Sequence, residues 1–434
     1  MARDILENME TISINQFAGL NEASIETGPI TLIIGQQATG KSVTAKLIFF
    51  FREIGVQLYS AATSGRSIEE FNTECKKKFC RYFPPDSWPP KNFSIVYKNN
   101  DQKLCVEYNH VEGKAPGDSI TMTFSAFYKD VLERFNIRWG ELSSGVAEGD
   151  SQKKEEAVQQ FRREFFGAMD KALGKWSKFQ QIFIPAGRAF FSLLEASVFR
   201  TLESGQDLDP FLVSFGAFLE DSKGVLYERR LFRKSGDRSV GMKAFQKMLS
   251  MVMNGDFKRV KRHDFLHYPD GRRVRLAQAS SGQQEALPLL LILGRFISLS
   301  HISGRSVYIE EPEAHLFPAT QRTIVEFMAS TYRERREEMC LLITTHSPYI
   351  LTAMNNLLQA GKKYSSSNAE TAKKLEGIVP SSLALNPGEV KAYSLENGAA
   401  KSIICPETKL IDAEIIDNVS ADIAVQFDQL LEDL

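Results

Sequence analysis

Apolar and polar residues alternate in short runs along the first 130 residues, which is the pattern of half-buried β-strands. The runs TISINQF, ASIE and ITLII are separated by turns at residues 19–21 and 28–29. After a helical stretch that extends to Phe51, the runs NFSIVYK, KLCVEYN and SITMTFS are broken by Pro, Gly and Asp. Residues 54–130 are therefore expected to form a small antiparallel sheet.

The middle of the chain shows helical spacing. Apolar residues recur three or four positions apart from Ala157 to Trp176, which predicts an amphipathic helix of about six turns. The run QQIFIP predicts a strand ending at Pro185, with a further helix after it, and DFLHYPDGRRVRLA predicts a hairpin. RSVYIE and MCLLITT lie on either side of a helical pattern at residues 321–331. This βαβ arrangement is typical of a parallel sheet.

The length of 434 residues exceeds that of one simple core, so the patterns predict a large α/β domain with added lobes. We expect residues 1–130 and 276–360 to form the core, residues 131–275 to form an inserted helical and basic lobe, and residues 361–434 to form a C-terminal extension. The extension ends in an acidic segment that either docks a partner or completes the core. Its expected helix has Ser420 as N-cap and an apolar face of Ile423, Phe427, Leu430, Leu431 and Leu434.

Charge bears on the class of partner. The formal net charge is −1, so affinity for nucleic acid would require a local patch. Residues 229–262 form the one strongly cationic block, with 11 Lys and Arg against Asp237 and Asp256. Apolar residues at helical spacing within this block, from Phe245 to Val252, indicate that part of it faces a core. A solvated helical face is therefore the favoured interpretation of the cations, with DNA binding as the alternative.

The remaining composition predicts a cytoplasmic protein that does not enter a membrane. No stretch approaches 18 uninterrupted apolar residues, and MARDILENME lacks an apolar signal core. The five cysteines form no C-x-x-C pair and no spacing suited to zinc. We expect them to be reduced thiols.

The stretch LIIGQQATGKS carries the first candidate chemistry. It has the form G-x-x-x-x-G-K-[ST] and follows an apolar strand, which is the context of a phosphate-binding loop. Lys41 is expected to neutralise the β and γ phosphates of ATP, and the Ser42 hydroxyl to ligate Mg²⁺. The residues expected to contact the nucleotide are Gly35, Gln36, Gln37, Ala38, Thr39, Gly40, Lys41, Ser42 and Val43.

Three further motifs follow in a fixed order: ASSGQQE from Ala279, VYIEEPEAHLFP from Val307 and LLITTHSPYIL from Leu341. Each one alone is an ordinary feature, namely a capped helix, a solvated pair of acids and a histidine satisfied by neighbours. In this order after a phosphate loop, they resemble the signature, Walker B and switch-histidine motifs of the ABC-type ATPases. The resemblance implies an α/β fold, an ABC-ATPase head with a mixed central sheet, an antiparallel side sheet and a helical lobe that carries the signature.

The motifs also imply roles. Glu310, at the end of an apolar strand, would hold Mg²⁺, and Glu311 would orient or deprotonate the attacking water. His346 would donate a hydrogen bond to the γ phosphate or to that water. The resemblance further implies that Ser280, Ser281, Gly282 and Gln283 contact ATP held by a second protomer, so that two ATP molecules join a head-to-tail homodimer.

The motif IEEPEAHLFP is similar to the corresponding motif of the OLD-type ATPases of bacterial anti-phage systems. The motifs FIPAGR and THSPYIL are also similar to theirs. After His346 the chain contains no Asp-x-Asp pair of the kind that a Toprim nuclease needs. Among such proteins, the chain most resembles the ATPase family of the PARIS anti-phage defence systems. That resemblance implies a large homo-oligomer, a separate Toprim-type nuclease effector and a phage-encoded trigger protein. The alternative is a RecF-like or SMC-like DNA-repair ATPase that binds DNA.

Two assignments stay open at this stage. The glutamine that couples the lobes of ABC heads is either Gln180 or Gln181, or both are plain surface residues. Arg188 either approaches the γ phosphate or forms a salt bridge at the start of a helix.

Overall fold

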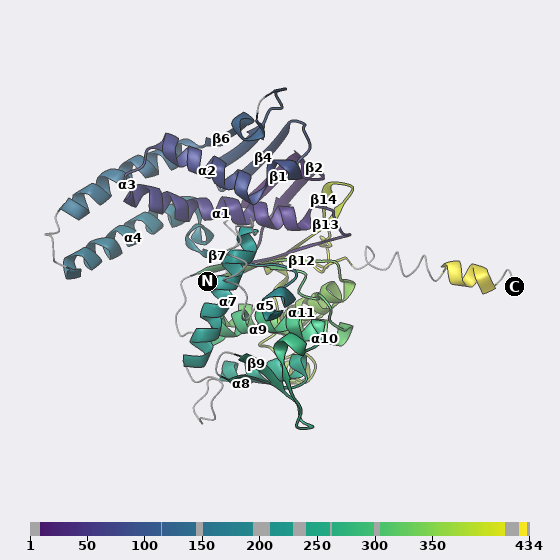
Figure 1. The fold of residues 1–434 in the computed structure, drawn as a ribbon. Helices are drawn as coiled ribbons and strands as arrows, with labels where there is room; N and C mark the ends of the chain where they lie inside the picture. Colours follow the sequence, from purple (N-terminus) through teal and green to yellow (C-terminus); the bar gives the residue numbers. More distant parts are fainter. Residues whose placement is uncertain are drawn as a thin grey trace.

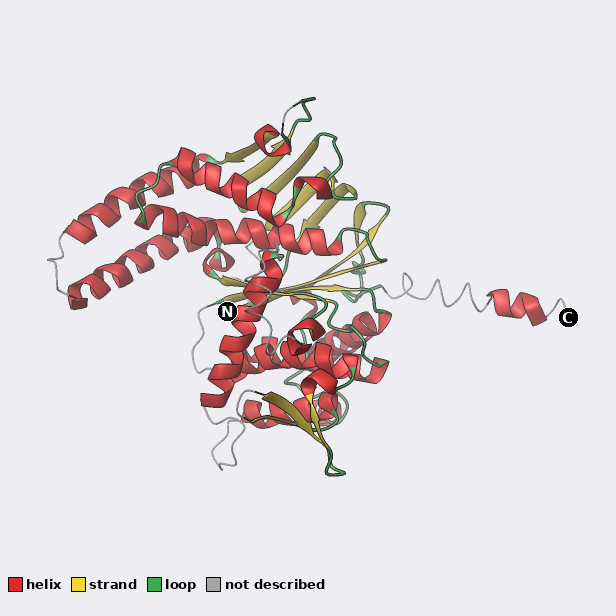
Figure 2. Cartoon of the chain, viewed as in Figure 1, coloured by secondary structure: helices red, strands yellow, loops and turns green. Residues whose placement is uncertain are grey.

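The computed structural model describes residues 9–113, 115–144, 151–193, 209–228, 240–260, 263–298, 304–412 and 425–431. Within these residues, one long sheet runs through the middle of the molecule, with helices on both sides (Figures 1 and 2). Its strands in spatial order are β6 (Ile120–Phe124), β5 (Gln102–Tyr108), β4 (Phe93–Asn99), β1 (Glu10–Phe17), β2 (Leu20–Glu26), β14 (Ala399–Ser402), β13 (Val390–Glu396), β3 (Ile30–Gly35), β12 (Met339–Thr345), β11 (Arg305–Glu310) and β7 (Gln180–Ile184).

The sheet consists of two blocks. Strands β13, β3, β12, β11 and β7 are parallel neighbours, whereas β6, β5, β4, β1 and β2 pair antiparallel. Strand β14 joins the blocks, because it pairs antiparallel with β13 and has one parallel bridge to β2. The predicted α/β fold with a mixed sheet and an antiparallel side is confirmed. The antiparallel strands continue the central sheet edge to edge and do not form a sheet of their own.

Helices cover each face of the sheet (Figure 1). On one side lie α1 (Lys41–Thr63), α2 (Ile68–Tyr82), α3 (Ala126–Ser144) and α4 (Ser151–Leu173), the last two forming a long projecting hairpin. On the other side lie α5 (Ala189–Leu193), α7 (Pro210–Glu228), α8 (Val240–Met253), α9 (Ser281–Ser298), α10 (Pro318–Glu334), α11 (Pro348–Ser366) and α12 (Ala369–Glu376). A second sheet of β8 (Asp256–Val260), β9 (His263–His267) and β10 (Arg273–Arg275) lies beside α8, and its β9–β10 pairing confirms the predicted hairpin.

The parallel strands fold this way because they are apolar on both faces. In β3, Leu32 packs into the core on the α9 side, while its neighbour Ile33 packs into the core on the α1 side. Val307 and Tyr308 of β11 divide between the same two cores. Side chains alternate across a strand, so a strand covered on both faces reads as a continuous apolar run.

Several predicted boundaries differ from the structural ones. The strand β7 lies in the segment expected as an inserted lobe, and β13 and β14 lie in the expected C-terminal extension, yet all three belong to the central sheet. The helix after the phosphate loop continues to Thr63, and α2 occupies a stretch that the strand pattern did not predict. Much of the cationic block, residues 229–239 and 261–262, lies outside the described residues, as does Ser420.

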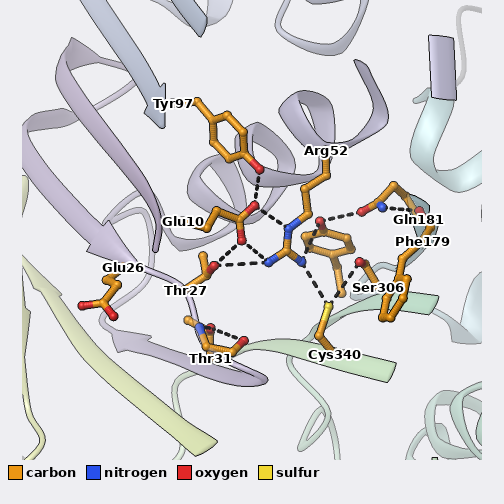
Figure 3. Close-up of polar contacts among 12 residues, drawn as sticks. Glu10, Glu26, Thr27, Thr31, Arg52, Tyr97, Phe179, Gln181, Ser306 and Cys340 are labelled. Carbon is orange, nitrogen blue, oxygen red and sulfur yellow. Dashed lines mark hydrogen bonds and ion pairs between the residues drawn. The ribbon is translucent and has the colours of Figure 1, made fainter. Parts of the chain in front are cut away.

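A buried ion pair fastens α1 to the strands (Figure 3). The Glu10 carboxylate accepts hydrogen bonds from the Arg52 guanidinium, the Thr27 hydroxyl and the Tyr97 hydroxyl. Arg52 also donates to the Cys340 thiol at 3.2 Å. We refer to these five residues as the Glu10–Arg52 cluster. It joins β1, α1, β4 and β12, and so fixes how the helix of the phosphate loop lies on the sheet.

Candidate nucleotide-binding site

The phosphate loop connects β3 to α1. Gly40, the residue before the helix, has a φ of 93°, a left-handed conformation that glycine adopts without steric cost. Helix α1 begins at the next residue, Lys41, and its free N–H groups lie at the loop. The Lys41 ammonium turns back and donates to the carbonyl oxygens of Gly35 at 2.8 Å and Gln36 at 2.5 Å.

A cavity of about 420 Å³ opens over this loop. Its walls combine the loop with two of the predicted catalytic residues, Glu311 and His346. The loop residues that line it are Gln37, Ala38, Thr39, Gly40, Lys41, Ser42 and Val43. Folding thus brings the phosphate loop together with two motifs that lie about 270 and 305 residues further along the sequence.

The paired glutamates lie where β11 ends. The Glu310 side chain is buried, and its Oε2 accepts a hydrogen bond from the Ala186 backbone N–H at 3.2 Å. Its other oxygen, Oε1, has no hydrogen-bond partner among the described residues. Glu311 has a φ of 43° and donates its backbone N–H to Thr344 O at 2.9 Å. A left-handed non-glycine residue at this point turns the Glu311 side chain away from the strand and toward the cavity.

His346 connects Glu311 to Lys41. The Lys41 ammonium lies 3.3 Å from His346 Nδ1, and His346 Nε2 lies 2.8 Å from Glu311 Oε1. An ammonium can only donate a hydrogen bond, so Nδ1 accepts from Lys41 and Nε2–H donates to the carboxylate. This chain of hydrogen bonds fixes the neutral Nε2–H tautomer of the imidazole.

Glu313 orients the histidine. Its Oε1 accepts hydrogen bonds from the His346 backbone N–H and from the Thr345 hydroxyl, both at 2.7 Å. Its Oε2, like Thr344 Oγ1, is buried without a partner among the described residues. Burial lowers the pKa of Lys41, and the charges of Glu311 and Glu313 act in the opposite direction.

The residues present fit Mg²⁺. Magnesium prefers oxygen ligands and is usually bound by one or two protein groups together with substrate phosphates. A buried carboxylate oxygen without a partner, Glu310 Oε1, is the kind of donor that such an ion requires. Ser42 supplies a hydroxyl from the wall of the cavity. These two side chains would hold Mg²⁺, which neutralises charge on phosphate oxygens when bound.

The predicted signature residues do not line this cavity. Ser280 and Ser281 are exposed at the start of α9. Ser280 N donates to Gln283 Oε1 at 3.1 Å, and Gln283 Nε2 donates to Met253 O at 2.6 Å, so Gln283 closes the helix end. A Cβ on Gly282 would lie 2.6 Å from His315 O, so only glycine lets α9 approach the loop after the paired glutamates.

Arg188 forms a salt bridge, one of the two roles considered for it, because its Nε lies 3.5 Å from Glu285 Oε2. The side chain is fully buried and donates to the backbone carbonyl oxygens of Glu285, Glu310 and Glu311 at 2.7 to 3.0 Å. Its backbone N–H donates to Glu285 Oε2 at 2.9 Å. Burial lowers the pKa of Arg188, and the charge of Glu285 partly offsets that effect. Arg188 therefore connects the signature helix α9 to the paired glutamates and does not face the cavity.

Neither candidate for the coupling glutamine reaches the site. Gln180 and Gln181 begin β7, where they pair with Arg305 and Ser306 at the start of the parallel strand β11. The loop and Glu310 lie at the opposite ends of these strands. Gln181 accepts a hydrogen bond from the Tyr308 hydroxyl at 2.7 Å. Both glutamines are thus excluded from contact with the nucleotide.

Three cavity residues were not predicted from the sequence: Ala18, Phe83 and Ser87. They come from the β1–β2 turn and from the segment after α2, so no motif marks them. Glu285 and Glu313 were also given no role, although they position Arg188 and His346. Both acids lie within the quoted motifs, which is the sequence signal that could have singled them out, and both are buried in the structure.

A family model described as "AAA domain, putative AbiEii toxin, Type IV TA system" matches residues 143–352. The match spans slightly less than half of the chain and includes the signature, paired-glutamate and switch-histidine motifs, but not the phosphate loop. No curated protein matches the chain.

Similar solved structures include three ATPase heads, each 11% identical to this chain. An SMC head bound to the C-winged helix domain of ScpA has a TM-score of 0.38, covering 91% of this chain and 96% of its own. The SMC head domain from Thermotoga maritima has a TM-score of 0.34, covering 91% and 98%. An ATP-binding cassette of an ABC transporter, in its ADP conformation, has a TM-score of 0.31, covering 96% and 97%.

Because these TM-scores lie below 0.5, the class of the protein is defined by its own features. A phosphate loop, paired glutamates and a histidine surround one cavity, and residues 143–352 match an AAA domain, so the site has the features of a nucleotide-binding ATPase. Among the described residues, no helix is long and apolar enough to span a bilayer. The five cysteines are free thiols.

Proposed function

We propose that this chain is the ATP-hydrolysing subunit of a bacterial anti-phage defence system. It forms a homo-oligomer, restrains a separate Toprim-type nuclease and releases it on meeting a phage-encoded trigger protein. The observation that carries ATP hydrolysis is the cavity in which Lys41, Glu311 and His346 are connected by hydrogen bonds.

The geometry supports a defined sequence of contacts. Phosphate oxygens of ATP are stronger acceptors than the carbonyl groups and the imidazole that Lys41 contacts in this structure. A γ phosphate in the cavity therefore draws Lys41 away from His346 and accepts a hydrogen bond from the imidazole. Glu311 then loses its partner and is free to accept a proton from the attacking water. The hydrolytic base is held inactive until the phosphate arrives.

A second copy of the chain is expected to complete the site. Ser280 and Ser281 lie at an exposed helix start outside the cavity of their own protomer, where they could bind phosphate oxygens of a neighbour. Phe317 and Tyr349 are 76% and 53% exposed and follow the paired glutamates and His346 in the sequence. Large apolar side chains that are exposed at the starts of α10 and α11 support an interface there.

The defence role rests on the sequence. The sequence motif EEPEAHLFP resembles that of OLD-type ATPases. The description of the matched family refers to a toxin–antitoxin system, which supports a system in which a second protein is the effector. The competing DNA-repair hypothesis depends on the cationic block of residues 229–262. That support is weaker because Phe245, Leu249 and Val252 of the block are buried in the core beside α9, so part of the block cannot face DNA.

The test is a gentle affinity purification of the Glu311→Gln variant from its native host in ATP and Mg²⁺, with measurement of intact-complex mass. We expect a homo-oligomer that carries a stoichiometric partner with Toprim metal-binding acids. A bare dimer bound to DNA, with an affinity that falls steeply with salt, would replace the defence role with DNA repair. The matched control is Lys41→Ala, which should lose nucleotide and therefore any nucleotide-dependent assembly.

A further inference from the structure

The C-terminal segment contains an apolar helical face that its own chain leaves uncovered. Residues 425–431 are helical and exposed, and Phe427, Leu430 and Leu431 are each at least 60% exposed. The spacing of these three residues, i, i+3 and i+4, places them on one face. Residues 410–434 include seven acids and no base, and the described helix carries one of these acids, Asp428.

A complementary surface lies between α10, α11 and α12, and we name it the α10–α12 groove. It has a volume of about 400 Å³ and is lined by the apolar side chains of Leu357, Leu375, Ile378 and Val379. Ile378 is 71% exposed, the largest exposure of any apolar lining residue. Helices α10 and α11 lie next to each other at the lower right of Figure 1.

The rim of the groove has the opposite charge to the helix. Arg322 and Lys363 line it, and only one acid, Glu326, lines it with them. Glu326 accepts a hydrogen bond from Arg322 at 2.7 Å, whereas the Lys363 side chain has no ion pair within the described residues. The helix of residues 425–431, whose one charged side chain is Asp428, therefore meets an apolar floor and a net cationic rim.

The last described residues before this helix lie against α11, one of the helices that form the groove. Ile411 is held by two hydrogen bonds to the Asn355 side chain of α11, at 2.7 and 2.8 Å, and Asp412 N–H donates to Ile403 O at 2.7 Å. The twelve residues 413–424 can span at most about 40 Å. Residues 425–431 can therefore reach the same groove of a neighbouring copy that packs close to α11.

We propose that the C-terminal helix of one copy occupies the α10–α12 groove of a second copy. Within one chain both surfaces are exposed, and exchange between two copies covers both of them. This contact uses neither the phosphate loop nor the signature residues. It therefore forms without ATP and holds copies together independently of the proposed ATP-dependent dimer.

The test uses the full chain in buffer without nucleotide. A photoreactive benzoylphenylalanine replaces Phe427 in an equal mixture of isotopically light and heavy chains, and cross-linked peptides are identified by mass spectrometry. We expect light–heavy pairs that join position 427 to residues of the α10–α12 groove. Cross-links confined to one chain, cross-links to another surface, or no cross-links would each overturn the proposal.

Two single substitutions and one control complete the experiment. Ile378→Asp in the groove and Leu430→Asp in the helix should each lower the light–heavy yield about tenfold or more, because each buries an unpaired carboxylate. Both positions are exposed in the chain, so the fold is preserved, and sedimentation should show a smaller complex. The control Ile137→Asp alters an apolar residue of α3 that is 66% exposed, and it should leave both measurements unchanged.

Discussion

The strands β11 and β12 carry two buried polar clusters at opposite ends, and the clusters differ in whether their atoms are satisfied. Near the start of β12, Cys340 belongs to the Glu10–Arg52 cluster, which Tyr308 of β11 also contacts and in which both carboxylate oxygens of Glu10 accept hydrogen bonds (Figure 3). Near the strand ends, Glu310 Oε1 and Glu313 Oε2 have no partner among the described residues.

This difference indicates that one cluster stabilises the fold and that the other binds a ligand. A buried charge that is fully paired contributes to the fold and is costly to break. A buried carboxylate oxygen that lacks a partner costs free energy in the protein alone, and it is retained where a ligand supplies the missing contact. The two clusters therefore make opposite predictions for substitution.

The largest expected effect is on hydrolysis. Glu311→Gln should lower kcat by about 10² to 10⁴-fold, because the amide cannot accept the proton of the attacking water, while ATP binding is retained. Phosphate release and equilibrium binding of labelled ATP measure the two quantities. The control is Glu107→Gln on the exposed face of β5, which should hydrolyse ATP like the parent chain. Unimpaired turnover in the Glu311 variant would show that another group is the base.

The next effect is on stability. Arg52→Met removes one partner of a buried pair and leaves the Glu10 carboxylate without its charge partner, so we expect a loss of about 3–5 kcal/mol in the free energy of unfolding. Urea unfolding followed by circular dichroism measures it. The double variant Glu10→Gln with Arg52→Met should recover part of the loss. If Arg52→Met alone costs less than about 1 kcal/mol, the pair does not fasten α1 to the sheet.

Substitution of Glu310, at the end of β11, should have the opposite effect on the free energy of unfolding. Glu310→Gln removes a buried charge with an unpartnered oxygen, so we expect the free energy of unfolding without nucleotide to stay the same or to rise by about 1 kcal/mol. Its Mg²⁺-dependent hydrolysis should nevertheless fall by about 100-fold or more. A destabilisation as large as that of Arg52→Met would mean that Glu310 belongs to the scaffold and would remove the contrast between the clusters.

The smallest expected effect is the pH dependence of the satisfied cluster. Burial acts to raise the pKa of Glu10, but the charge of Arg52 and the hydrogen bonds from Arg52, Thr27 and Tyr97 outweigh it, so the pKa lies below its usual value. A depressed folded-state pKa stabilises the protein above the unfolded value of about 4.3, and this contribution is lost as the pH falls through the folded value. The stability difference between the parent chain and Glu10→Gln should therefore narrow below about pH 4 in urea titrations. A constant difference down to pH 3 would contradict the assignment.

Helix α2 was not predicted, although the sequence contains a local signal for it. Helix α2 has a capping box in which Ser67 and Glu70 exchange hydrogen bonds, and its buried residues Phe71, Cys75 and Phe79 recur every four positions. The prediction of strands for residues 54–130 did not take this capping box into account. In contrast, β13 pairs with β3 across some 360 residues, and no local pattern specifies such a pairing.

The sequence by itself determined the phosphate loop, the paired glutamates, the histidine and the alternation that builds a doubly covered sheet. These are local features, because each depends on residue type and short spacing. Only the tertiary structure decided that Arg188 is buried between α9 and the paired glutamates and that Glu313 orients His346. It also decided that the glutamines of β7 lie at the end of the strand away from the cavity. Which end of a strand a side chain reaches, and which buried oxygen lacks a partner, depends on contacts between segments far apart in the chain. Those contacts form only when the whole sheet is assembled.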